Sequence, residues 1–249
     1  MNTLFTFGCS FSEPWDSDAL KRVPDNSRWV YLKKYCEGRK IQTYSDVIAE
    51  NLNLESKNYA HGGNSNETIF SKICRRCHEF KKGDIIIVQW TGVQRFEWVN
   101  PVINRFVNLM PSCRPSNCGY GSSEVLISED TFNEIMNNRT HIEYYKRVLE
   151  YENILKLLCE SMGVDLFIFY MDRELFKINL ESLNSDVRYF FNNELNYHTD
   201  YDDYFGLKSI QIINTFTNGE IYDNHYTLDG HIKMGELFLE HIIKNRKHG

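Results

Sequence analysis

Four short stretches rich in apolar residues are spaced along the chain and predict the strands of a buried sheet. They cover Leu4 to Phe7, Lys57 to Ala60, Ile85 to Trp90 and Val164 to Tyr170. The third stretch is β-branched and does not alternate with polar residues, which is typical of a central strand covered on both faces. The pattern therefore favours a parallel sheet buried between two layers.

Stretches whose apolar positions recur three and four residues apart lie between these strands and predict helices. One opens at Thr43, whose side chain suits an N-cap, and the others cover about 67–80, His141 to Met162 and His231 to Lys244. Strands that alternate with helices predict an α/β fold of three layers, α/β/α, with a mostly parallel sheet and right-handed crossovers.

Composition adds limits to this picture. Hydrophobic residues make up 42% of the chain and charged residues 25%, which is typical of a globular protein, and the net charge of −6 gives no basic footprint for nucleic acid. We expect one domain over residues 1–249, with an insertion at about 100–140, where prolines and a Gly-Tyr-Gly-Ser-Ser run interrupt the periodicity.

No apolar run approaches the roughly 18–20 residues that a membrane span needs. The first predicted strand begins at Leu4, which leaves no room for a signal peptide. We therefore expect a cytoplasmic protein without membrane or nucleic-acid partners, a virion component being the alternative setting. The seven cysteines are expected to be reduced thiols. The pattern indicates no oligomeric state.

Small and polar residues follow the ends of the predicted strands. Gly8 ends the first strand and Ser10 stands in the next turn, Gly63 follows the second strand, and Thr91 follows the third. Because the carboxyl ends of parallel strands lie on one edge of a sheet, we expect these residues to meet in one crevice.

Asp223 and His225 complete a predicted Ser-His-Asp triad. Residues two apart in an extended segment point to the same side, so the Asp223 carboxylate would orient the His225 ring. His225 would then take the proton of Ser10, which becomes the nucleophile. The backbone N–H groups of Ser10 and Gly63 would hold the oxyanion that develops on the substrate.

Three blocks of the chain together resemble the SGNH/GDSL hydrolases. The run from Gly8 to Ser12 resembles the Gly-Asp-Ser-Leu block, Asn58 to Asn66 resembles the second block, and Asp223 to His231 resembles the closing Asp-x-His-Pro-Asn-x-x-Gly-His block. The "GCSF" start is similar to a divergent branch found in phage and bacterial genomes. The resemblance implies a flavodoxin-like sheet of five strands in the order 2-1-3-4-5, and it places Gly63 at the oxyanion glycine.

The third block departs from the family pattern. An asparagine that usually donates to the oxyanion is absent from the run Gln89 to Gln94. Thr91, Gln94 and Asn66 are the alternatives for that role, and we favour Thr91. We expect His61, Asn64, Asn66 and Gln94 to contact substrate.

Other chemistry is disfavoured. Cys74 and Cys77 sit within a predicted helix, and Cys113 and Cys118 are spaced too widely for the second half of a common zinc site. Cys9 as nucleophile is disfavoured because Ser10 holds the matched position.

The sequence thus predicts a serine esterase that needs no metal or cofactor and acts on a small acyl ester, with an O-acetyl group on a carbohydrate as the expected substrate. An O-acyltransferase of the same fold and a non-catalytic carbohydrate-binding or structural module are the alternatives.

Overall fold

The structure is a computed structural model of the chain of residues 1–249. The description that follows is of residues 1–10, 12–22, 33, 36, 42–92, 95–100, 105–109, 130, 133–134, 137, 141–170, 188–189 and 228–247. Within this part, no helix is long and apolar enough to cross a membrane.

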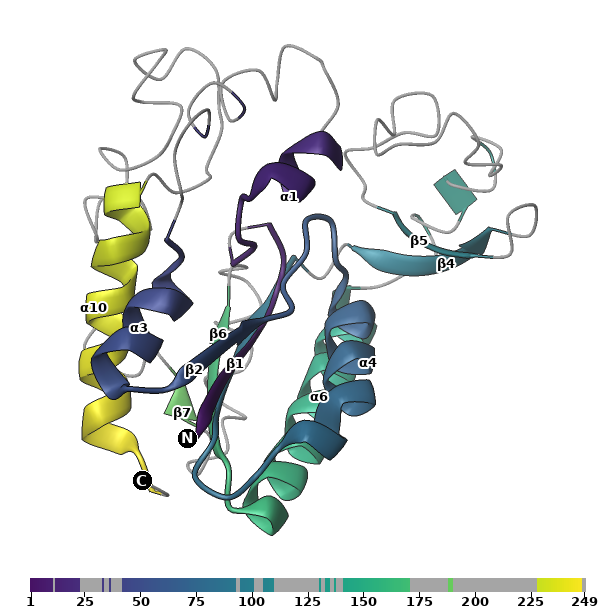
Figure 1. The fold of residues 1–249 in the computed structure, drawn as a ribbon. Helices are drawn as coiled ribbons and strands as arrows, with labels where there is room; N and C mark the ends of the chain where they lie inside the picture. The colour runs from purple at the N-terminus through teal and green to yellow at the C-terminus, as the bar shows by residue number, and fades with distance from the viewer. Residues whose placement is uncertain are drawn as a thin grey trace, which may run out of the picture.

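A parallel sheet forms the centre of the fold (Figure 1). Its strands lie in the order β2-β1-β3-β6-β7, which is the predicted order 2-1-3-4-5 along the chain. The fifth position is occupied by only two residues, which pair with β6 at Phe167 and Ile168, so the sheet has four strands of ordinary length rather than five. The strands are β1 (Thr3–Phe7), β2 (Glu55–Asn58), β3 (Ile85–Trp90), β6 (Asp165–Tyr170) and β7 (Arg188–Tyr189).

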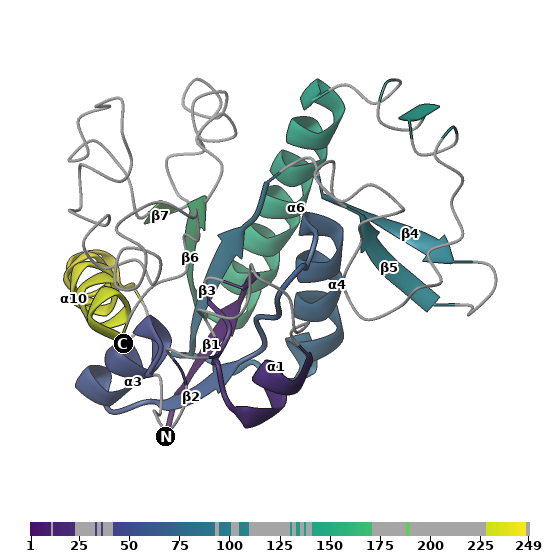
Figure 2. The same cartoon turned by 90° about the horizontal axis from the view of Figure 1, so that it is seen from above.

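Two pairs of helices cover the two faces of the sheet, as seen from above in Figure 2. One face is covered by α3 (Tyr44–Leu52) and α10 (Leu228–Asn245), and the other by α4 (Asn66–Arg76) and α6 (His141–Met162). Alternate residues of β3 enter the two cores, because successive side chains of a strand point to opposite faces. The α3/α10 core contains Ile85, Ile87, Tyr44 and Phe238, and the α4/α6 core contains Ile86, Val88, Ile73 and Leu155. This confirms the predicted three-layer α/β/α fold.

The helices begin where the sequence offers caps. Thr43 forms a capping box with Asp46 at the start of α3, and Ser65 accepts a hydrogen bond from Thr68 N at the start of α4. Helix α3 ends at Asn53, whose φ of 52° lies in the left-handed region. The predicted helix at about 67–80 continues past α4 as a short 3-10 helix, η1 (Cys77–Glu79).

Several elements differ from the sequence expectation. Strand β2 lies two residues earlier than predicted. After it, Asn58 Oδ1 accepts a hydrogen bond from Ala60 N at 2.9 Å, while the chain still follows β1 through a bond from Tyr59 N to Thr6 O at 2.8 Å. Helix α10 begins three residues before His231. An antiparallel hairpin, β4 (Phe96–Asn100) and β5 (Arg105–Leu109), was not predicted. The insertion at about 100–140 falls mostly outside the described residues and stays a prediction.

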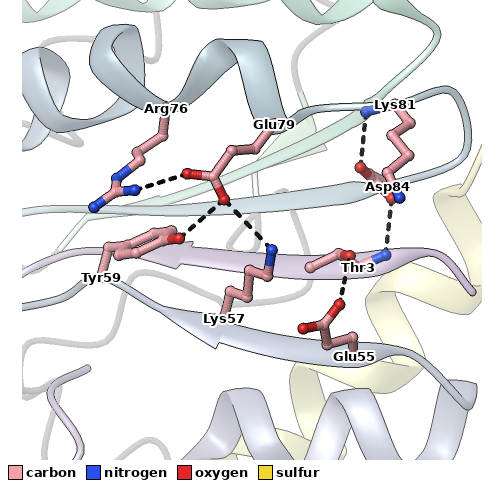
Figure 3. A network of polar contacts seen from close by, with 8 residues as sticks. All are labelled: Thr3, Glu55, Lys57, Tyr59, Arg76, Glu79, Lys81 and Asp84. Carbon is pink, nitrogen blue, oxygen red and sulfur yellow. Dashed lines mark hydrogen bonds and ion pairs between the residues drawn. The ribbon is translucent and has the colours of Figure 1, made fainter.

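Glu79 joins η1 to the β2 side of the sheet (Figure 3). Its carboxylate accepts from Arg76 Nη1 at 2.9 Å, from Tyr59 Oη at 3.1 Å and from Lys57 Nζ at 3.4 Å. The hydrogen bond from Arg76 lowers the pKa of Glu79 below its ordinary value. Arg76 also lies over the Tyr59 ring, 4.7 Å from its centroid. The charged form of Glu79 therefore holds the helix end against the strand.

Two buried aspartates fix the amino edge of the sheet. Asp84 accepts from Thr3 N and Lys81 N, both at 2.8 Å, as Figure 3 also shows. Asp165 at the start of β6 lies 3.6 Å from Arg246 Nε, just after α10. These contacts tie the strand starts and the end of α10 together at the edge opposite the predicted crevice.

Candidate active site

The turn after β1 presents Ser10 at the carboxyl edge of the sheet. Ser12 N donates to Cys9 O at 3.0 Å and closes the turn, and Ser10 is only 5% exposed. A Cβ at Gly8 would lie 2.7 Å from Gln89 Oε1 and 2.8 Å from Ser12 Oγ, so this position accepts only glycine. Close packing thus favours glycine at position 8, independently of any chemistry at Ser10.

A chain of hydrogen bonds anchors this turn from below. Gln89 Oε1 accepts from Ser12 Oγ and, at 3.4 Å, from Cys9 N. Because an amide oxygen only accepts, the Ser12 hydroxyl donates to Gln89, and the Tyr44 hydroxyl, 2.5 Å away, donates to Ser12. Tyr44 and Gln89 are both 0% exposed. The last residues of β3 and the first residue of α3 therefore set the position of the loop that carries Ser10.

The second predicted block lies directly against Ser10. A Cβ built at Gly62 would stand 3.6 Å from Ser10 Cβ, while a Cβ at Gly63 would have nothing within 4 Å. Gly63 has a φ of 81°, which explains why glycine stands there. Within the described part of the chain, neither Ser10 N nor Gly63 N donates a hydrogen bond. Two N–H groups are thus available beside the Ser10 turn, as an oxyanion hole requires.

Glu13 holds the same loop, and sequence reasoning missed it. This carboxylate is 3% exposed, and its Oε2 accepts from Gly62 N at 2.6 Å. The bond fixes the peptide group immediately before Gly63. A glutamate three residues after Ser10 is the only sequence signal for this role, and its burial depends on a contact 49 residues away.

Asn64 and Asn66 join the loop to the ends of two strands. Asn64 Nδ2 donates to Gly8 O at 2.8 Å, while the Asn66 amide donates to Thr91 O at 3.0 Å and accepts from Thr91 N at 2.8 Å. Both side chains are buried. The prediction that they also bind substrate stays a prediction.

Thr91 lies at the end of β3, as expected. Its backbone N–H already donates to Asn66, so its hydroxyl is the group left to act as the third oxyanion donor. The Oγ1 atom is buried and has no hydrogen-bond partner within the described residues.

The His61 ring lies in the same loop as Gly63, where its Nδ1 donates to Gly62 O at 2.8 Å. These placements leave the predicted roles of Thr91 and His61 as predictions.

The remaining predicted site residues are outside the described part of the chain. They are Asp223, His225 and Gln94, and the geometry of the triad therefore stays a prediction. Among the described residues there is no group of three or more His, Cys, Asp or Glu side chains that could hold a metal ion. Cys74 lies exposed on α4 and Cys77 lies in η1, whereas Cys113 and Cys118 are outside the described residues.

Comparison with known proteins gives structural likeness only. No family model matches the sequence, and no curated protein matches it either. Among solved structures, YxiM from Bacillus subtilis superposes with a TM-score of 0.50 at 11% identity, over 98% of this chain and 56% of YxiM. A G-D-S-L family lipolytic protein from Desulfitobacterium hafniense gives a TM-score of 0.47 at 11% identity, over 97% and 99% of the two chains. The chain thus spans little more than half the length of YxiM, and the likeness shows a shared fold.

Proposed function

We propose that this chain, which has the three-layer fold implied by its resemblance to the SGNH/GDSL hydrolases, is a divergent serine esterase of that family. One observation carries the proposal. The Ser10 turn lies against the Gly62–Gly63 loop, and the N–H groups of Ser10 and Gly63 donate to no other group in the described part of the chain. A hydroxyl beside two uncommitted N–H donors is the arrangement that acyl transfer needs.

The proposed reaction proceeds through an acyl-enzyme. His225 takes the proton from Ser10 Oγ, which attacks the carbonyl carbon of the ester, while Asp223 holds the imidazole in the required tautomer. The oxyanion is held by Ser10 N and Gly63 N, with the Thr91 hydroxyl as the proposed third donor. His225 then protonates the leaving alcohol, and water, activated by the same histidine, releases the acid and restores Ser10.

An O-acetyl group on a carbohydrate is the proposed substrate. The usual substrates of the resembled family and the aromatic content of 14% support this choice. A small acyl group also suits a nucleophile that is only 5% exposed. Transfer to a sugar hydroxyl in place of water would make the same site an acyltransferase, and acetyl-sugar formation distinguishes the two.

Ser10→Ala tests the proposal directly. Wild-type protein and this variant would be given p-nitrophenyl acetate and a fluorophosphonate probe, with Ser161→Ala, an exposed serine on α6, as the matched control. We expect S10A to lose labelling and to lose roughly 10⁴-fold or more in kcat, because the nucleophile is gone. Labelling that persists in S10A, or absence of turnover by the wild type, would refute the esterase.

A non-catalytic carbohydrate-binding module is the second candidate, and the state of Thr91 favours it. The backbone N–H of Thr91, the residue proposed in place of the expected asparagine, already donates to Asn66 Oδ1, and its side chain is 0% exposed. A site with two donors instead of three would lose about 10²–10³ in rate. Sugar binding without ester turnover would support this second candidate.

A further inference from the structure

The loop that carries Gly63 is a β-turn whose two ends are fixed to the end of β1. Asn64 N donates to His61 O at 3.2 Å and closes the turn. Gly8 O, just after β1, accepts from His61 N at 3.2 Å and from Asn64 Nδ2 at 2.8 Å. Both ends of the turn therefore rest on one carbonyl oxygen, two residues before Ser10.

The middle peptide group of this turn joins Gly62 to Gly63, and its orientation decides where the Gly63 N–H points. Gly63 has a φ of 81°, whereas the φ of Gly62 is not positive, which is the pattern of a type II turn. A type I turn joins the same ends, but its middle peptide group is rotated by roughly 180°. Because the C=O and N–H of a trans peptide point in opposite directions, that rotation would reverse the direction of the proposed oxyanion donor.

Glycine at both middle positions leaves the backbone free to adopt either form. A residue without a Cβ takes positive and negative φ about equally readily, so Gly63 fits both turns. A larger residue cannot replace Gly62 to stiffen the turn, because a Cβ there would lie 2.9 Å from Glu13 Oε2. A side-chain contact on the middle peptide group can therefore select the form.

The His61 ring makes such a contact. Its Nδ1 lies 2.8 Å from Gly62 O, and because a carbonyl oxygen only accepts, Nδ1 is the donor. In the described part of the chain, the His61 ring is the group that donates to Gly62 O. Glu13, by contrast, binds Gly62 N, which belongs to the preceding peptide group. The two side chains therefore hold two different peptide groups of the loop.

We propose that His61 is a positioning residue for the oxyanion hole. By binding Gly62 O, its ring holds the Gly62–Gly63 peptide group in the type II orientation and so directs the Gly63 N–H towards the oxyanion. The catalytic part of this inference rests on the proposed esterase function, whereas the orientation of the peptide group can be measured without any substrate.

Three variants of His61 separate this role from a contact with substrate. His61→Asn places an amide N–H near the position of Nδ1, His61→Gln places one near the position of Nε2, and His61→Leu retains neither. On p-nitrophenyl acetate, we expect H61L and H61Q to lose about tenfold in kcat with little change in KM, because a misdirected donor forfeits part of the rate that one oxyanion donor contributes. H61N should recover most of kcat. His78→Leu, at an exposed histidine on η1, is the matched control and should keep the wild-type kcat.

Isotope labelling reports on the peptide group directly. Gly62 and Gly63 are the only two adjacent glycines in the sequence. In protein made with glycine that carries ¹³C at the carbonyl and ¹⁵N, and with unlabelled serine, an HNCO spectrum therefore selects the single amide of Gly63. In a type II turn this amide proton lies close to the Gly62 Hα protons, and in a type I turn it lies close to the Gly62 amide proton. We expect NOEs of the type II pattern in wild type and H61N, and a gain of the type I pattern in H61L and H61Q.

The two measurements keep the possible failures apart. NOEs in H61L that match the wild type would overturn the positioning role. If the wild type turns over no ester, the esterase proposal fails, and the NOEs alone decide whether His61 holds the peptide group. Changed NOEs with an unchanged kcat in H61L would overturn the link to catalysis. Activity that H61Q restores and H61N does not would assign His61 to substrate through Nε2 and overturn the proposal. Circular dichroism confirms that each variant is folded.

Discussion

Replacing Glu13 tests how the proposed oxyanion loop is held in place. Its Oε2 atom lies 2.6 Å from Gly62 N, and the side chain is 3% exposed, so Glu13→Ala would leave a partly buried N–H without this acceptor. A hydrogen bond to a charged group is worth about 1.5–3 kcal/mol. We therefore expect E13A to lose about 2 kcal/mol of unfolding free energy, measured by urea denaturation.

The effect on catalysis should exceed what lost stability explains. The Gly62 peptide group immediately precedes Gly63, the proposed donor, and loss of one oxyanion donor costs about 10²–10³ in kcat. E13A shifts the donor without removing it, so we expect kcat to fall by roughly 10- to 100-fold with a smaller change in KM. Glu13→Gln retains an oxygen acceptor and should recover most of kcat.

Asp84→Asn is the control for this experiment. Asp84 is also a buried acid that accepts backbone N–H groups, but it lies at the amino edge of the sheet. D84N should lose stability while its folded fraction keeps the wild-type kcat on p-nitrophenyl acetate. The reasoning is refuted if folded E13A keeps kcat within about threefold of wild type, or if E13Q is as impaired as E13A.

Two further predictions concern stability. Gly235→Ala places a Cβ 2.7 Å from Val47 Cβ, between α10 and α3, and such overpacking costs about 1–3 kcal/mol. Because alanine in place of glycine stabilises a helix by only about 1 kcal/mol, we expect G235A to have a lower free energy of unfolding in urea denaturation. A more stable variant would contradict the packing. Glu79→Gln should lower Tm at pH 7, because the hydrogen bond from Arg76 lowers the folded-state pKa of Glu79. That stabilisation is fully present above the unfolded-state pKa of Glu79 and is lost as pH falls through its lower folded-state pKa. The Tm difference between E79Q and wild type should therefore shrink as the pH is lowered through this range, and a constant difference would refute the reasoning.

The strands that the sequence predicted well are those buried on both faces. All six residues of Ile85–Trp90 are buried. Because both faces of this strand pack in a core, its sequence is a continuous apolar, β-branched run that can be recognised without the structure. Strand β2 was placed two residues late because, among the described strands, it pairs with β1 alone and carries the polar run Glu55–Asn58 at a sheet edge. The two-residue strand β7 is too short to carry a periodic pattern.

The contacts that hold the candidate site were harder to predict than the positions of its residues in the fold. Ser10 and Gly63 could be placed at strand ends because strand ends and glycines are visible in the local sequence, and the resemblance implied the roles that we propose for them. Glu13 binds Gly62, 49 residues away, and Gln89 binds Cys9, 80 residues away. A buried polar side chain whose partner is so distant looks like any surface residue until the fold is known.

The order of strands has a consequence for how the protein is made. The first 90 residues contain three neighbouring strands, β2-β1-β3, together with α3, α4 and both proposed N–H donors. Once these residues have left the ribosome, the three strands can pair, but Ile85 and Ile87 have only the α3 part of their cover until α10 is made. Synthesis therefore passes through a stage in which the loop that carries Ser10 can form while one apolar face of the sheet is only partly covered and is prone to aggregation.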